Sequence, residues 1–235
     1  FPAGPQMLEG LNVGSVIFGE TGEAPPIFAQ SAQANLVYVA HQAAAPQAEA
    51  LIVHKDSPIK TVADLKGKRI ALNKGSNVHY LLLKILESNG LALSDIQPVY
   101  LPPADARAAF ERGSVDAWVI WDPFYAAAEQ QLSARKLQDG EGLVSNYQFY
   151  LADRKFAQEN SKVLETIIQE VSATSDWIKD NRKEAAKILE KPTGLNLAIL
   201  NTSIDRIGLG VQPISTDTIA KQQSIADAFY QQKLI

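Results

Sequence analysis

Residues 68–86, KRIALNKGSNVHYLLLKIL, contain the change of pattern that decides the fold. The apolar run at residues 69–73 predicts a short strand, Gly75 predicts a turn, and the apolar positions after Ser76 predict a helix. Amides in the first turn of a helix have no intrahelical acceptor, so a strand that turns into a helix presents donors to an anion. We therefore predict a small-anion site at the amides of Gly75, Ser76, Asn77 and Val78. The alternative is that Ser76 is an ordinary N-cap.

The composition indicates a globular chain and excludes several classes of function. Of the 235 residues, 46% are hydrophobic, and 22 Lys and Arg stand against 26 Asp and Glu without a basic stripe for nucleic acid. No apolar run approaches the roughly 20 residues that cross a bilayer. The absence of cysteine excludes disulfides and thiolate metal sites, and the three histidines are too far apart for a two-histidine metal motif. We expect no metal site and no nucleic-acid partner.

Strand and helix patterns alternate along the first two thirds of the chain, and the last third is nearly all helical. This order predicts an α/β fold with parallel or mixed sheets flanked by helices. The block at residues 55–147 could close a sheet by itself, so we expect it to form lobe 2. Residues 1–54 and 148–235 would together form a discontinuous lobe 1. Because ligands gather at the carboxyl ends of strands, we expect the ligand in a cleft between the lobes.

The chain opens on a short predicted helix at residues 6–12, followed by a strand at residues 15–18. This order is that of a βαβ unit whose first strand is absent. We therefore expect lobe 1 to be incomplete at its N-terminus. A strand edge left open in this way would pair with a second copy, so we also expect a tendency to self-associate.

Other candidate binding residues follow predicted strands or lie one turn into a helix. Thr21 and Gly22 lie in the turn-rich loop after the predicted strand at residues 15–18, where a hydroxyl followed by glycine can present donors to a small ligand, although Thr21 could also be only a turn residue. Trp121 ends the most apolar strand and could form a platform for a ligand. Asp122 follows it and precedes a proline, which is also an ideal helix start. His79 could face a bound anion, although a lone histidine is more often bonded locally.

Four segments resemble the periplasmic aliphatic sulfonate-binding proteins of ABC importers, which are solute-binding proteins of the nitrate, taurine and sulfonate type. They are TGEAPP, KGSNVHY, YLPPADARAAF and VDAWVIWDPF, which begin at Thr21, Lys74, Tyr100 and Val115. The resemblance implies a two-lobed periplasmic-binding-protein-like fold of type II without enzyme activity or cofactor. It also implies an N-terminal strand and helix that this sequence does not show. It further implies capture of an aliphatic sulfonate for sulfur acquisition, delivery to a membrane permease, and a periplasmic or lipid-anchored extracytoplasmic location. Carried over by motif, the pocket residues are Thr21, Gly75, Ser76, Asn77, His79, Trp121 and Asp122.

Two alternatives share this architecture. One is a binding protein for another small anion or zwitterion, such as taurine, nitrate or a pyrimidine precursor. The other resembles the thiamine-pyrimidine synthases, which are enzymes that use a histidine and a cysteine-rich motif that supports iron. The absence of cysteine in this chain argues against the second alternative.

Overall fold

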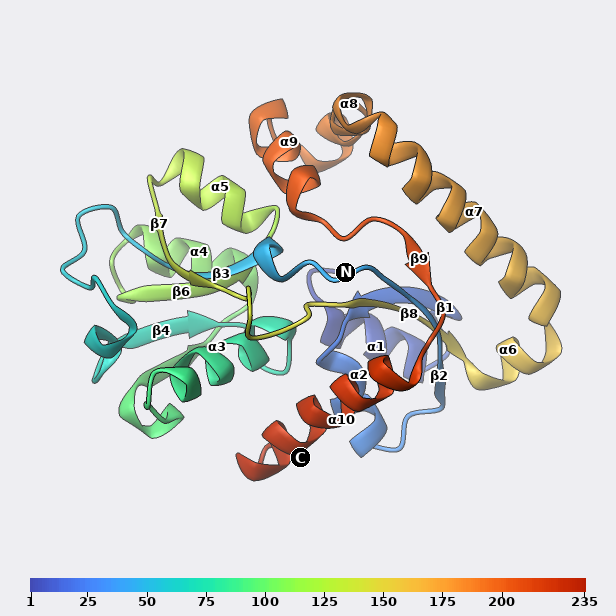
Figure 1. Ribbon diagram of the computed structural model, residues 1–235, viewed down its shortest axis with the longest axis horizontal. Helices are drawn as coiled ribbons and strands as arrows, with labels where there is room; N and C mark the ends of the chain where they lie inside the picture. Colours follow the sequence, from blue (N-terminus) through green and yellow to red (C-terminus); the bar gives the residue numbers. More distant parts are fainter. The chain divides into compact units, whose positions relative to one another are not determined.

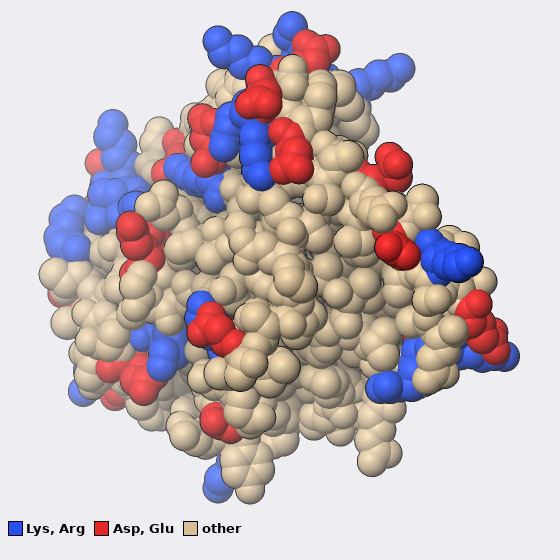
Figure 2. Space-filling view, turned by 45° about the vertical axis from the view of Figure 1, so that its right-hand side comes forward, with Lys and Arg blue, Asp and Glu red and all other residues tan.

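The computed structural model describes all 235 residues and divides them into two compact units. Unit 1 comprises Phe1–Ala44, Tyr147–Ala185 and Gly208–Ile235, and unit 2 comprises Ala45–Asn146 and Ala186–Ile207. Figure 1 labels the helices and strands of both units. None of the helices is long and apolar enough to cross a membrane. On the face shown in Figure 2, Lys and Arg side chains are interspersed with Asp and Glu side chains.

Unit 1 is built on a four-stranded sheet in the order β1-β8-β2-β9. These strands span Phe18–Gly22 (β1), Gln148–Asp153 (β8), Leu36–Gln42 (β2) and Val211–Gln212 (β9). Every neighbouring pair is antiparallel. Strand β8 lies between β1 and β2 and runs against both, and β9 runs against β2. The helices of this unit are Gly4–Asn12 (α1), Pro25–Ser31 (α2), Arg154–Glu159 (α6), Ser161–Asp180 (α7) and Thr216–Gln231 (α10). Met7, Leu8 and Leu11 of α1 pack with Phe149 and Leu151 of β8 to form its core.

Unit 2 is built on a five-stranded mixed sheet in the order β5-β4-β6-β3-β7. The strands span Gln97–Tyr100 (β5), Arg69–Leu72 (β4), Ala117–Trp121 (β6), Glu49–Val53 (β3) and Arg135–Asp139 (β7). β4 runs parallel to β5 and β6, whereas β3 runs antiparallel to β6 and β7. The helices are Asn77–Ser88 (α3), Pro103–Glu111 (α4), Phe124–Gln131 (α5), Arg182–Thr193 (α8), in which the unit boundary falls, and Leu197–Arg206 (α9). Short 3-10 helices span Pro46–Ala48, Val62–Leu65 and Leu93–Asp95.

Strand β3, which lies between β6 and β7, is buried on both faces and separates two layers of the core of unit 2. Leu51 and Val53 lie in the layer that contains the apolar side chains of α3, while Ala50 and Ile52 lie in the layer with α4 and α5. Burial on both faces explains why this strand is an unbroken apolar run rather than an alternating one. The apolar side of α3 is packed against the sheet, which fixes the position of its first turn.

The predicted α/β class with helices flanking parallel or mixed sheets is confirmed. The units differ from the expected lobes in two segments and at Tyr147, which was expected in lobe 2 but belongs to unit 1. Residues 45–54 were expected in lobe 1, but they belong to unit 2, where β3 hydrogen-bonds with β6 and β7. Residues 186–207 were also expected in lobe 1, but α9 packs on α5 of unit 2. In both places the sequence shows an element but not its partner, because pairing depends on segments far apart in the chain.

Candidate functional site

The first turn of α3 is formed by a left-handed glycine followed by an extended serine. Gly75 has φ of 73° and Ser76 has φ of −101° with ψ of 176°. Ser76 occupies the N-cap position, but its hydroxyl donates to the Asn73 carbonyl at 2.7 Å and accepts no hydrogen bond from the helix. The structure therefore does not have the ordinary serine N-cap that was the alternative interpretation. The Ser76 and Val78 amides have no acceptor within the chain.

His79 supports this turn from inside the protein. The Gly75 amide donates to His79 Nδ1 at 3.2 Å, so the neutral ring carries its proton on Nε2. The imidazole is fully buried, and burial, aided by the charge of Lys74, lowers the pKa of His79 to about 4. His79 is therefore neutral at physiological pH. The Gly75 amide, predicted as a donor for the anion, is used by His79 instead.

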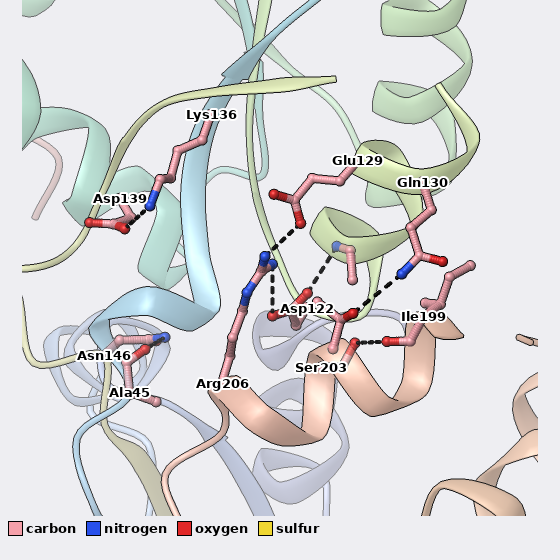
Figure 3. Close-up of polar contacts among 12 residues, drawn as sticks. Ala45, Asp122, Glu129, Gln130, Lys136, Asp139, Asn146, Ile199, Ser203 and Arg206 are labelled. Carbon is pink, nitrogen blue, oxygen red and sulfur yellow. Dashed lines mark hydrogen bonds and ion pairs between the residues drawn. The ribbon is translucent and has the colours of Figure 1, made fainter. Parts of the chain in front are cut away.

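Asn77 begins α3, and its side chain is bonded within unit 2. Asn77 Nδ2 donates to Asn146 Oδ1 at 2.6 Å, and Asn146 Nδ2 donates to the Ala45 carbonyl at 2.8 Å. Figure 3 shows the second of these bonds. Asn77 and Asn146 are 6% and 3% exposed, so both amide groups are held away from solvent. Because its side chain is bonded to Asn146, Asn77 contributes to the candidate site through the backbone of the helix start.

Lys74 is a candidate that the sequence reasoning did not single out. Its side chain is exposed, its Nζ lies 5.5 Å from the centre of the Tyr100 ring, and it forms no ion pair. No acidic residue lies in the first turn of α3. An unpaired cation beside helix amides and without a neighbouring carboxylate favours a ligand with a negative charge. The sequence feature that could have indicated Lys74 is its position directly before Gly75.

Trp121 and Asp122 lie at the carboxyl end of β6. Because β4 and β6 are parallel neighbours, the end of β6 lies on the same edge of the sheet as the turn that leads into α3. Trp118 is fully buried, as expected for the opposite face, whereas Trp121 is partly exposed and packs edge-on to Phe124. Trp121 is thus placed where a ring can reach a ligand.

Asp122 is turned toward the protein. Asp122 Oδ1 accepts the Ala126 amide at 2.9 Å, and Oδ2 lies 3.6 Å from Arg206 Nη1 (Figure 3). Arg206, from α9, also pairs with Glu129 at 2.7 Å and covers the Tyr125 ring at 4.2 Å. Burial raises the pKa of Asp122 to about 6, an effect that the charge of Arg206 opposes. The predicted helix start is displaced by one residue, because Pro123 occupies the N-cap position and α5 begins at Phe124, but the Asp122 carboxylate still accepts an amide of the first turn.

Thr21 and Gly22 lie in unit 1, at the end of β1. Thr21 is 4% exposed, and its hydroxyl oxygen has no hydrogen-bond partner. A Cβ at Gly4 would come within 1.9 Å of that oxygen, so only glycine allows α1 to begin there. α1 has no side-chain cap. The opening turn of α1 is therefore a second group of candidate donors, which the sequence reasoning missed because it treated residues 1–5 only as a lead into the helix.

The structure thus gathers Gly75, Ser76, Asn77 and His79 at one helix start in unit 2, with Trp121 and Asp122 on the same sheet edge. His41 and His54 are both engaged locally, with Thr218 and with the Phe110 carbonyl. No group of three or more His, Cys, Asp or Glu side chains could hold a metal ion. What the helix start offers chemically is hydrogen-bond donation to a fixed negative charge.

Comparison with known proteins shows the family of the chain. The NMT1/THI5-like family model matches residues 4–185. The chain belongs to the NMT1/THI5-like family. The alkanesulfonate-binding protein SsuA from Xanthomonas axonopodis pv. citri, solved bound to MOPS, is 45% identical with a TM-score of 0.95, over 100% of this chain and 81% of that one.

Two relatives from Escherichia coli extend this comparison. The periplasmic aliphatic sulphonate binding protein SsuA is 47% identical with a TM-score of 0.92, over 100% of this chain and 81% of that one. The taurine-binding periplasmic protein of strain K12 is 28% identical over 83% of this chain and 64% of its own length. All three of these relatives are binding proteins rather than enzymes, and the two from Escherichia coli are periplasmic.

Proposed function

We propose that this protein is a periplasmic binding protein that captures aliphatic sulfonates and delivers them to an ABC permease. The observation that carries the proposal is the start of α3, where the amides of Ser76 and Val78 have no acceptor and no carboxylate lies in the first turn. A sulfonate keeps its charge at every physiological pH, so it needs donors rather than a titrating partner. The names of the two SsuA relatives and the MOPS in one of them, a morpholine that carries a propanesulfonate, support this ligand class.

In this proposal the residues have different roles. The sulfonate accepts hydrogen bonds from the first turn of α3, with Lys74 adding a favourable charge nearby. Trp121 lies along the organic tail of the ligand. Thr21, next to Gly22, is the candidate hydroxyl donor of unit 1, because its buried oxygen has no partner of its own. Asp122 contributes by fixing the start of α5 behind Trp121.

The test is calorimetric titration of the protein with ethanesulfonate, hexanesulfonate, MOPS, taurine, sulfate and nitrate. We expect the organic sulfonates to bind and nitrate not to bind. Tight binding of taurine alone would assign the protein to the zwitterion alternative. No binding of any sulfonate would overturn the proposal.

A matched pair of variants isolates the backbone donor. Ser76→Pro removes one of the two amides without an acceptor, at the N-cap position that proline occupies before α4 and α5. Ser76→Ala loses the same hydroxyl but keeps the amide. We expect Ser76→Pro to bind hexanesulfonate about 10-fold more weakly than Ser76→Ala, the value of one charge-assisted hydrogen bond. Equal affinities would show that this amide does not bind the sulfonate.

Location and assembly are the finer parts of the proposal. We propose the periplasm because both relatives from Escherichia coli are periplasmic, and a lipid-anchored form is the alternative that cell fractionation separates. The outer edge of β1 carries no further strand, and we propose that it can pair with a second copy. Light scattering that gives only monomer at high concentration would refute this self-association.

A further inference from the structure

The chain passes between the units at four places, and the second of these junctions is formed by the adjacent residues Asn146 and Tyr147. Asn146 is the last residue of the long segment of unit 2, and Tyr147 is the first residue after the chain returns to unit 1. Both are buried, at 3% and 7% exposed. Each makes a hydrogen bond to a candidate binding loop of its own unit.

In unit 2 the junction is bonded to the start of α3. Asn146 Oδ1 accepts from Asn77 Nδ2 at 2.6 Å, and Asn146 Nδ2 donates to the Ala45 carbonyl at 2.8 Å. The Ala45 amide donates to the Ser145 carbonyl at 3.0 Å, which ties together the two segments at the unit boundary. Asn146 has φ of 49°, a left-handed conformation that asparagine tolerates better than most residues.

In unit 1 the junction is bonded to the loop after Thr21. Glu23 is 1% exposed, and its Oε2 accepts the Tyr147 amide at 2.9 Å. Helix α10 braces both residues, because Gln222 Nε2 donates to the Glu23 carbonyl at 3.0 Å and Lys221 Nζ donates to the Tyr147 hydroxyl at 3.0 Å. The loop that follows Thr21 and Gly22 is therefore fixed to the junction by a buried carboxylate.

We propose that the Asn146–Tyr147 junction links the two groups of ligand donors, with Glu23 and Asn146 as positioning residues that do not themselves contact the ligand. This proposal rests on the proposed function. Displacement of the junction moves the Asn77 side chain in one unit and the Glu23 loop in the other. A ligand that orders one donor group therefore favours the ordered state of the other group.

The test is a double-mutant cycle with Asn146→Gly and Glu23→Ala. Asn146→Gly keeps the left-handed backbone and removes both side-chain bonds, while Glu23→Ala removes the acceptor for the Tyr147 amide. We expect each variant to bind hexanesulfonate about 10-fold more weakly. Because both break the same link, we expect the double variant to lose about 10-fold to 20-fold, whereas independent effects would multiply to about 100-fold. Glu23→Gln, which keeps an acceptor, should recover most of the affinity.

Hydrogen exchange on the ligand-free protein separates the proposed link from a local structural role. A substitution with only a local role would not change the exchange rates of amides in the other unit. We expect Glu23→Ala to raise exchange in residues 74–80 of unit 2, and Asn146→Gly to raise exchange in residues 20–26 of unit 1. The matched controls are Ser175→Ala in unit 1 and Ser203→Ala in unit 2, each of which loses one side-chain hydrogen bond away from the junction. In these controls we expect exchange to rise only locally and the affinity to stay unchanged.

A 100-fold loss in the double variant, or exchange that changes only in the substituted unit, would overturn the link. The two proposals fail separately. If the unsubstituted protein bound no sulfonate, the proposed function would fall, and the exchange experiment would still decide whether the junction links the two loops.

Discussion

The His79 imidazole and the Asp122 carboxyl predict opposite effects of pH on the stability of unit 2. The pKa of His79 is lowered from 6.5 to about 4 in the folded chain, so the unfolded chain takes up this proton first as the pH falls. The stability that the neutral ring contributes is present above pH 6.5 and is lost as the pH falls toward 4. The pKa of Asp122 is raised from 3.8 to about 6, so here the folded chain takes up the proton first. Its buried charge lowers stability at neutral pH, and acid relieves that penalty.

The two effects are of similar size. The shift for His79 is 6.5 − 4, or about 2.5 units, and at 1.36 kcal/mol per unit it corresponds to about 3 kcal/mol. The shift for Asp122 is 6 − 3.8, or about 2 units, which corresponds to about 3 kcal/mol of opposite sign. We expect the contributions of these two groups to the pH dependence to cancel almost completely between pH 7 and pH 4. Substitution of either residue should reveal the contribution of the other residue to the pH dependence of stability.

The assay is urea unfolding at several pH values, followed by tryptophan fluorescence in a Trp177→Phe background. Trp177 lies in α7 of unit 1 and is 40% exposed, so its replacement leaves Trp118 and Trp121 as reporters of unit 2. His79→Asn retains an acceptor for the Gly75 amide, and Asp122→Asn retains one for the Ala126 amide.

Between pH 7 and pH 4 we expect His79→Asn to gain about 3 kcal/mol relative to the parent chain, and Asp122→Asn to lose about as much. The comparison uses only the change in the free energy of unfolding between pH 7 and pH 4. A stability difference between variant and parent that is the same at every pH therefore does not affect it. Variants that both follow the parent at every pH, or that both deviate with the same sign, would refute the reasoning.

Three further predictions concern binding and packing. Affinity for hexanesulfonate should be constant from pH 7 to pH 8.5, because His79 stays neutral, Asp122 stays ionised and the ligand keeps its charge; a fall of 10-fold in calorimetry across that range would contradict it. Lys74→Gln should weaken binding about 5-fold and reduce its dependence on salt, as expected for one exposed charge worth about 1 kcal/mol, whereas Lys74→Arg should preserve both. Arg206→Met should destabilise unit 2 by about 3 kcal/mol at pH 7, because it leaves the buried Asp122 without its cation; urea unfolding should show that the added Asp122→Asn recovers part of the loss.

Sequence patterns predicted the local elements well where apolar periodicity was strong. The turn from β4 into α3 is where residues 68–86 predicted it, because a glycine between an apolar strand and an apolar helix admits few other structures. The short polar strand β7, at Arg135–Asp139, was missed. Its residues carry no alternating apolar pattern, and it forms only because β3 offers an edge for pairing.

The candidate residues at the α3 start were grouped correctly by the sequence because they are close in the chain. Their individual roles depend on partners that are distant, and local reasoning could not assign them. Asn77 is bonded to Asn146, and Asp122 faces Arg206. In each case a separation of about 70 residues or more hides the pair from any local pattern.

An anion site of this kind requires that the first amides of a helix remain available although polar side chains surround them. The polar residues of this turn are all bonded elsewhere in ways that prevent capping. The Ser76 hydroxyl donates to Asn73, the Asn77 amide group donates to Asn146, and the His79 ring accepts from Gly75. Each bond stabilises the turn and also removes a side chain that could occupy the place of the ligand. The stability of the turn and its capacity to bind an anion therefore arise from the same hydrogen bonds.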